Sequence, residues 1–254
     1  MREKHIDERL QTICDLVPEG TGTLLDVGTD HGYVPIHLIK NNIVKRAIAS
    51  DISLPSLKKA QRENEKNGLS NRIETRVGNG LEVIHRGDEI DVVVVAGMGG
   101  VLISQLLETS KELISRSGFT FIFQPVQAPQ ELRYYLARNN FVILDEVFLK
   151  SSNKYYQIIV AMYKATPSFV EHFPEFEDVE EYYELSPGII RKSDAVLLEY
   201  VQGRLEEISY ISLQLEALKE KRGLTSVQED RLNLMVQKKE FYEKVRKYAL
   251  KRIG

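Results

Sequence analysis

The chain has 254 residues, of which 43% are hydrophobic, enough to bury one α/β domain and a smaller appended unit. Its single cysteine, Cys14, excludes an internal disulfide and fits a reducing compartment. The formal net charge of −3 means that the protein as a whole does not attract nucleic acid. Binding to nucleic acid would therefore need a local basic region. No apolar run approaches the length of a membrane span, and the first residues lack the apolar core of a signal peptide. We therefore expect a cytoplasmic protein with no membrane partner.

The segment that organises the chain follows a predicted short helix at residues 6–16. Thr23 to Val27 is predicted to be a buried strand that breaks into a turn bearing Gly28 and Gly32 and restarts as a helix near Val34. A strand leading into a helix N-terminus in this way presents backbone N–H groups and a positive dipole end. The pattern therefore predicts a binding site for a polar, partly negative group.

The glycine spacing narrows the choice of ligand. The loop reads Asp-x-Gly-x-x-x-Gly, whereas a dinucleotide site has Gly-x-Gly-x-x-Gly after the strand. Asp26 would repel a pyrophosphate and attract the ammonium group of an amino-acid moiety. S-adenosylmethionine carries such a group, so we predict a site for this cofactor. The alternative is an ordinary strand-to-helix turn.

Strands and helices alternate up to residue 163 and predict an α/β fold. We expect strands at 46–51, 73–77, 90–96 and 119–123, helices at 54–67, 101–115 and 129–139, and a final hairpin of strands 141–149 and 155–163. The segment 90–96 is apolar on both faces, which is typical of a central strand in a parallel sheet. The alternation indicates a doubly wound, Rossmann-like sheet whose ligands bind at the carboxyl ends of the strands.

The composition changes after residue 163. We expect a first domain at 1–164, a linker at 165–192 and a helical hairpin, coiled-coil-like, at 193–254, where apolar residues recur at helical spacing. Ser226 and Glu229 are predicted to form a capping box at the start of the second helix. From Lys219 onward, eleven Lys or Arg residues stand against five acids, which indicates a nucleic-acid contact or, equally, a solvated helix surface.

The order of these motifs resembles a known family. Asp26-x-Gly28, Asp51, the later Ala60 and Asn64, and Gly78-Asn79-Gly80-Leu81 resemble the class I methyltransferases. The segments 26–35, 96–100 and Gln124-Pro125 more narrowly resemble the bacterial tRNA (adenine-N1)-methyltransferases that act at adenine 22 in the D-arm. That family pairs its methyltransferase domain with a C-terminal coiled coil, so the resemblance covers the whole chain. It implies S-adenosylmethionine as cofactor and tRNA as partner.

The resemblance also implies a set of cofactor-binding residues. In this chain they are Asp26, Gly28, His31, Gly32, Asp51, Asn79, Gly80, Gly97 and Met98. The carboxylate of Asp51 would accept the ribose hydroxyls, and its alternative role is to cap the following helix. The chain departs from the family at Asn79, where relatives usually carry Asp, and at Val126, where they often carry Asn.

The catalytic residue implied for adenine methylation is Asp30, because a carboxylate stabilises the positive charge that forms on the ring. Its alternative role is a loop acid that caps the next helix, and His31 is a weaker candidate for a general base. Tyr33, Gln124 and Pro125 are expected at the rim of the substrate pocket, and Lys244, Arg246 and Lys247 are expected to contact tRNA.

No histidine has metal-ligand spacing, so we expect no metal, and we expect a monomer or weak dimer. Two other functions remain open at this point. A methyltransferase for a small molecule or a protein would share the cofactor loops, and a non-catalytic RNA-binding module would be compatible with Asn79.

Overall fold

The computed structural model describes residues 6–165 and 181–253. The chain divides into two compact units, Met1–His172 and Phe173–Gly254, called here the sheet unit and the helical unit. The boundary lies inside the linker expected from the sequence.

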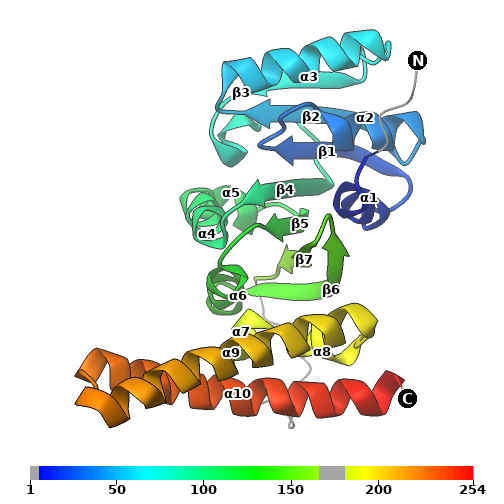
Figure 1. Cartoon of the computed structure of the whole chain (residues 1–254). Coiled ribbons are helices and arrows are strands. Elements are labelled where there is room, and N and C mark those ends of the chain that lie inside the picture. The colour runs from blue at the N-terminus through cyan, green and yellow to red at the C-terminus, as the bar shows by residue number, and fades with distance from the viewer. Residues whose placement is uncertain (1–5, 166–180, 254) are drawn as a thin grey trace. The chain divides into compact units, whose positions relative to one another are not determined.

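The sheet unit contains a seven-stranded sheet in the order β3-β2-β1-β4-β5-β7-β6 (Figure 1). The first five strands pair in parallel, and β7 runs antiparallel to both β5 and β6. The strands are β1 (Thr21–Val27), β2 (Val44–Asp51), β3 (Ile73–Val77), β4 (Val92–Met98), β5 (Thr120–Pro125), β6 (Phe141–Ser151) and β7 (Lys154–Tyr163). The predicted doubly wound α/β fold is confirmed.

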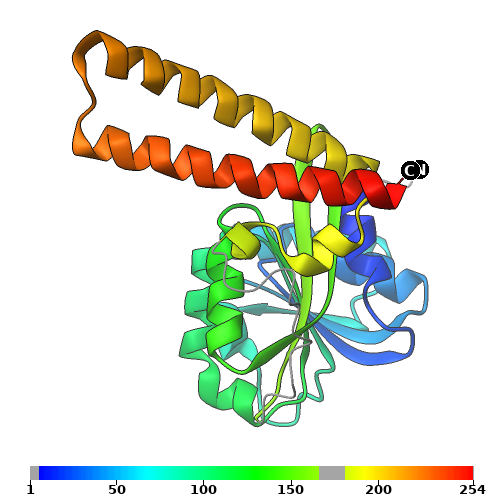
Figure 2. The same cartoon turned by 90° about the horizontal axis from the view of Figure 1, so that it is seen from below.

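Alternation of side chains along the strands builds a core on each face of the sheet. Leu25 and Val93 point to one face and pack in one apolar cluster, whereas Leu24 and Val92 point to the other. Figure 2 shows the helices that cover these two faces on opposite sides of the sheet. The helices of this unit are α1 (Glu8–Asp15), α2 (Tyr33–Lys40), α3 (Leu54–Lys66), the short 3-10 helix η1 (Gly80–Val83), α4 (Gly100–Thr109), α5 (Lys111–Ser115) and α6 (Pro129–Arg138).

The predicted helix at 101–115 is divided into α4 and α5. The hydroxyl of Thr109 donates to the carbonyl of Leu106, a local bond that competes with the helical pattern where the helix ends.

The predicted hairpin between β6 and β7 is confirmed. Ser152 and Asn153 both have positive φ, at 48° and 60°, as a tight two-residue hairpin turn requires.

The helical unit contains α7 (Glu181–Glu184), α8 (Pro187–Arg191), α9 (Ala195–Arg222) and α10 (Ser226–Ile253). The two long helices run antiparallel, as Figure 2 shows. Helices α7 and α8 lie within the expected linker, so its described part is helical. Glu184 joins α7 to α10, because its carboxylate accepts from Lys238 Nζ at 2.7 Å and from the Tyr242 hydroxyl at 3.1 Å.

Two details of the predicted hairpin need correction. The capping box uses Thr225 and Gln228, one residue before the predicted pair. The Gln228 N–H donates to the Thr225 hydroxyl, and the Thr225 N–H donates to the Gln228 side chain. The helical spacing of apolar residues also predicts Val227, Leu234, Phe241, Val245 and Tyr248 on one apolar face of the second helix, but Val227 and Leu234 are 74% and 43% exposed. The buried face of α10 is formed instead by Met235, Phe241, Tyr242, Val245 and Ala249.

Within residues 6–165 and 181–253, no helix has the length and apolar character to cross a membrane.

Candidate active site

The predicted site residues of the sheet unit come from consecutive strand ends. The sheet order places the carboxyl ends of β3, β2, β1, β4 and β5 in one row along a single edge. Gly78 to Gly80, Asp51, Asp26 to Gly32, Gly97 with Met98, and Gln124 with Pro125 therefore follow one another along this edge. A doubly wound sheet binds its ligands at such an edge.

The loop after β1 is anchored to β2 by its backbone. The N–H groups of Gly28 and Thr29 both donate to the carbonyl of Ser50, at 2.8 and 2.9 Å. Gly28 has φ +77°, and a Cβ built on it would lie 2.4 Å from the terminal methyl of Met98. The backbone angle therefore favours glycine here, and the flexible Met98 side chain from β4 would have to shift to admit a larger residue. The loop turns into α2 at Gly32, whose φ is +69° and which packs against Ala60 of α3.

Asp26 is a buried carboxylate at the centre of this edge, 6% exposed. Burial, helped by the negative charge of Asp51, raises the pKa of Asp26 from its usual 3.8 to about 6. The Thr29 hydroxyl lies close enough to moderate this rise, but it is buried and completes no hydrogen bond among the described residues. A buried carboxylate and an unsatisfied hydroxyl on one loop are groups that a cationic, hydrogen-bonding ligand would satisfy. Sequence reasoning missed Thr29, because a threonine in a loop carries no pattern that distinguishes it.

Asp51 is the last residue of β2 and is predicted either to bind the ribose or to cap the following helix. Its Oδ1 accepts from the Ser53 N–H at 2.7 Å, and Ser53 is the residue that caps α3. Oδ2 of Asp51 has no hydrogen-bond partner among the described residues and is open to a hydroxyl group of a ligand. The alternative role as the helix cap is therefore filled by Ser53.

The turn after β3 carries Asn79 and Gly80. Asn79 is exposed and its side chain makes no capping bond. Gly80 is buried with φ +58°, and a Cβ on it would collide with the Leu106 side chain at 1.7 Å. Gly80 therefore packs closely on α4, while the neighbouring Asn79 side chain is exposed at the carboxyl end of β3.

The loop after β4 is shaped by a bulge between Ala96 and Met98. Gly97 sits in this bulge with φ +78° and is exposed. The carbonyl of Met98 accepts from the Val126 N–H at 2.9 Å, so the loop is tied to the end of β5. The bulge places an exposed backbone segment directly beside the loop of Gly28.

Asp30, the predicted catalytic residue, lies exposed on the β1 loop with two basic neighbours. Its Oδ1 accepts from Lys59 Nζ at 2.9 Å, and its Oδ2 lies 3.3 Å from His31 Nε2. The ring of His31 stacks on that of Tyr33, with centroids 5.1 Å apart and planes 8° from parallel. Lys59 was missed by sequence reasoning, because it approaches from α3, which begins 24 residues after Asp30.

Gln124 and Pro125, predicted at the rim of the substrate pocket, are instead buried, and Gln124 has 0% exposure. The Gln124 Oε1 accepts from Arg9 Nη1 at 2.7 Å, and its Nε2 donates to the Pro125 carbonyl at 3.1 Å. The exposed residue at the end of β5 is Val126, at 54%. Arg9 thus takes up the hydrogen-bond acceptor of the Gln124 side chain. The two residues are 115 positions apart in the chain, so no local sequence pattern predicts this contact.

Lys244, Arg246 and Lys247 belong to the helical unit, on α10. Lys244 and Lys247 are exposed and three positions apart, so they lie on one face of the helix. Arg246 faces α9, where its Nη1 lies 3.5 Å from the Gln202 side chain. The three cations therefore do not form one surface.

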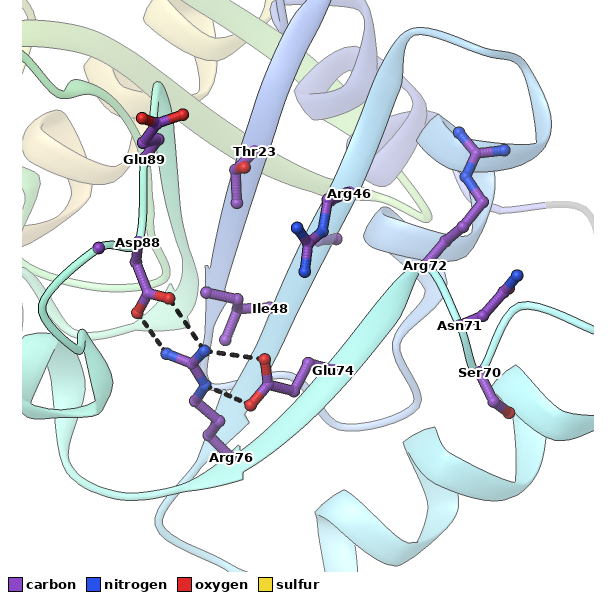
Figure 3. Close-up of a pocket in the computed structure, with 12 residues that line it drawn as sticks. Thr23, Arg46, Ile48, Ser70, Asn71, Arg72, Glu74, Arg76, Asp88 and Glu89 are labelled. Carbon is purple, nitrogen blue, oxygen red and sulfur yellow. Dashed lines mark hydrogen bonds and ion pairs between the residues drawn. The ribbon is translucent and has the colours of Figure 1, made fainter.

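A cavity of about 370 Å³ lies beside β2 and β3, away from the strand carboxyl ends. Figure 3 shows Arg76 between Glu74 and Asp88, whose carboxylates both accept from it. These hydrogen bonds lower the pKa of both acids. None of the predicted site residues lines this cavity. In the described parts of the chain, no group of three or more His, Cys, Asp or Glu side chains could hold a metal ion.

A sheet in this order, parallel from β3 to β5, with an acidic glycine loop after β1 and an acid at the end of β2, defines a Rossmann-like methyltransferase domain. Comparison with known proteins also identifies a methyltransferase domain. The methyltransferase domain family matches residues 6–159, and the chain belongs to this family.

Several proteins similar to this chain are named as tRNA methyltransferases. The tRNA (adenine(22)-N(1))-methyltransferase of Bacillus subtilis (strain 168) is 37% identical over 161 residues, which make up 63% of this chain. The matched segment is 66% of that relative, slightly under two thirds of its length. The crystal structure of the B. subtilis tRNA methyltransferase TrmK is 28% identical, with a TM-score of 0.81, over 95% of this chain and 99% of that chain.

The Streptococcus pneumoniae protein Sp1610, crystallised with S-adenosyl-L-methionine, is 26% identical with a TM-score of 0.78. That match covers 95% of this chain and 100% of the other.

Proposed function

We propose that this protein transfers a methyl group from S-adenosylmethionine to N1 of adenine 22 in the D-arm of tRNA. The observation that carries the proposal is structural likeness to TrmK over nearly the full length of both chains, helical unit included. The named activity of the 37% identical B. subtilis relative supports the reaction and the position. The S. pneumoniae structure with S-adenosyl-L-methionine supports the cofactor.

The residues at the strand ends fit this cofactor. The glycine at position 28 lets Met98 approach the loop closely. The Thr29 hydroxyl is buried without a hydrogen-bond partner among the described residues, and the Asp26 carboxylate beside it is buried. Asp26 binds the ammonium group, and the free Oδ2 of Asp51 accepts from the ribose hydroxyls. Asn79 and Gly80 face the adenine edge, while Gly32, His31 and Gly97 line the methionine side. When bound, S-adenosylmethionine supplies a methyl group on an already activated sulfonium.

The work left to the protein is to position the target base and stabilise its charge. Adenine N1 is a neutral nucleophile, and its methylation leaves the ring positively charged. Asp30 stabilises that charge, and Lys59 and His31 hold its carboxylate in place before the base arrives. The stacked rings of His31 and Tyr33 provide an aromatic surface for a base that has left its stack.

The helical unit supplies part of the RNA contact through Lys244 and Lys247, whose exposed side chains suit phosphate groups. The protein acts in the cytoplasm as a monomer or weak dimer, which sedimentation at micromolar concentration would check.

The test is methyl incorporation from labelled S-adenosylmethionine into a tRNA transcript, compared with a transcript in which adenine 22 is guanine. We expect label in the first and none in the second. Asp30→Asn, which keeps the shape of the side chain, should lower kcat at least about tenfold while cofactor binding by calorimetry stays unchanged.

Label in both transcripts would refute the position and keep the reaction. No label in either, with cofactor binding intact, would refute tRNA as substrate.

A further inference from the structure

Arg9, on α1, is held in an unusually defined position for a partly exposed arginine. Its Nη1 donates to the buried Gln124 side chain at 2.7 Å, and its guanidinium carbon lies 5.7 Å from the centre of the Tyr156 ring. The side chain is only 21% exposed. One contact fixes an edge of the guanidinium and the other limits the tilt of its plane, so little rotational freedom remains to be lost on binding.

The remaining edge of the guanidinium carries Nη2. Nη2 has no hydrogen-bond or ion-pair partner among the residues that the structure describes. Asp7 lies 3.9 Å from Nε, but this carboxylate is 47% exposed and its Oδ1 already caps α1 through the Leu10 N–H. An exposed pair at that distance neutralises the arginine only weakly.

The position of Arg9 places it on the substrate side of the active-site edge. Gln124 is at the carboxyl end of β5, beyond β4 and on the side away from Asp51 and Asn79. Tyr156 is near the start of β7, which runs antiparallel to β5 and so begins at the same edge. Arg9 therefore lies at the same edge of the sheet as Met98, whose strand β4 pairs with β5.

We propose that Arg9 binds a backbone phosphate of the RNA at the entrance to the active site, at or next to the target nucleotide. The inference rests on the proposed function, since it takes RNA as the substrate. Phosphate is favoured over the base, because a fixed cation beside adenine would oppose the positive charge that N1 methylation creates. A guanidinium with a free edge matches phosphate oxygens in charge and geometry.

The experiment measures tRNA affinity and steady-state methylation between about 50 and 200 mM salt for wild type, Arg9→Met and Arg9→Lys. A lost phosphate contact should weaken tRNA binding by Arg9→Met about tenfold or more at low salt. It should also reduce the slope of log affinity against log salt concentration by about 0.7 to 0.9. Arg9→Lys should keep the wild-type slope, because it retains the charge while losing the bond to Gln124. Cofactor affinity should be equal in all three proteins.

Arg46→Met is the matched control. Arg46 is an exposed arginine toward the amino end of β2, in the cavity of Figure 3, and its replacement removes the same charge far from the active-site edge. It should leave the salt slope unchanged. An equal fall in both Met variants would mean that the slope reports net charge, and the assignment would be overturned.

An unchanged slope in Arg9→Met, with weaker methylation, would mean that Arg9 acts only by bracing Gln124, and this also overturns the proposal. Wild type that methylates tRNA while Arg9→Met matches it throughout refutes the Arg9 assignment alone. Wild type that neither binds nor methylates tRNA refutes the proposed function, and the inference with it.

Discussion

Replacing Asp26 by asparagine should have opposite effects on the stability of the folded protein and on its affinity for the cofactor. The ionised Asp26 carboxylate is buried, and its pKa rises from 3.8 to about 6 in the folded protein. Folding is therefore opposed by about 3 kcal/mol when the group is charged, at 1.36 kcal/mol for each pH unit. An asparagine side chain has nearly the same shape and no charge, so Asp26→Asn should stabilise the cofactor-free protein at pH 8 by up to about 3 kcal/mol. For a chain of this size the melting temperature should rise by roughly 6 to 12 °C at most.

The sign of the pH dependence follows from the raised pKa. The folded protein binds the Asp26 proton more tightly than the unfolded chain does, so wild-type stability falls as pH rises from about 4 to about 6. The advantage of Asp26→Asn should be absent near pH 4, grow across that window and remain constant above it. Cofactor affinity should show the opposite effect, with a loss of at least about tenfold in the variant at pH 8, because the partner of the ammonium group is gone.

The assay is thermal unfolding of the cofactor-free protein from pH 4 to pH 8, with cofactor binding measured by calorimetry at pH 8. Asp15→Asn is the control, since Asp15 is an exposed aspartate on α1 whose replacement relieves no burial. An Asp26→Asn protein that melts below wild type at pH 8 would refute the reasoning. So would a stability difference that does not change with pH.

Two further outcomes follow from the structure. Gly28→Ala should destabilise the sheet unit by about 1 to 2 kcal/mol, because its φ of +77° is unfavourable for alanine, and should weaken cofactor binding. In a Met98→Ala background the collision is absent, so adding Gly28→Ala to the Met98→Ala single variant should cost only the backbone term, which thermal unfolding of the two variants would measure. Lys244→Glu with Lys247→Glu should weaken tRNA binding by at least about tenfold in a filter-binding assay, with cofactor affinity unchanged. Unaltered tRNA affinity would remove these lysines from the RNA contact.

The sequence alone determined the sheet, its strand-end loops and the residues with local signatures. Periodicity along each strand and glycine at turns depend on neighbours within a few residues, so they can be seen without the fold. The position of the acid at the end of β1 could also be predicted, because the sheet places residue 26 at the carboxyl edge in any doubly wound arrangement. The order of several such loops then pointed to the methyltransferase family.

Only the tertiary structure decided which polar side chains at that edge are free. Gln124 has the same local sequence whether or not α1 covers it, and it is the packing of Arg9 that buries and occupies it. Lys59 reaches Asp30 because α3 crosses the β1 loop, which depends on helix position. The pKa of Asp26 likewise rises because of surrounding atoms from other strands. The local sequence pattern predicts the element and position from which a side chain projects. Whether that side chain is buried or hydrogen-bonded depends on segments far away in the sequence, which the local pattern does not contain.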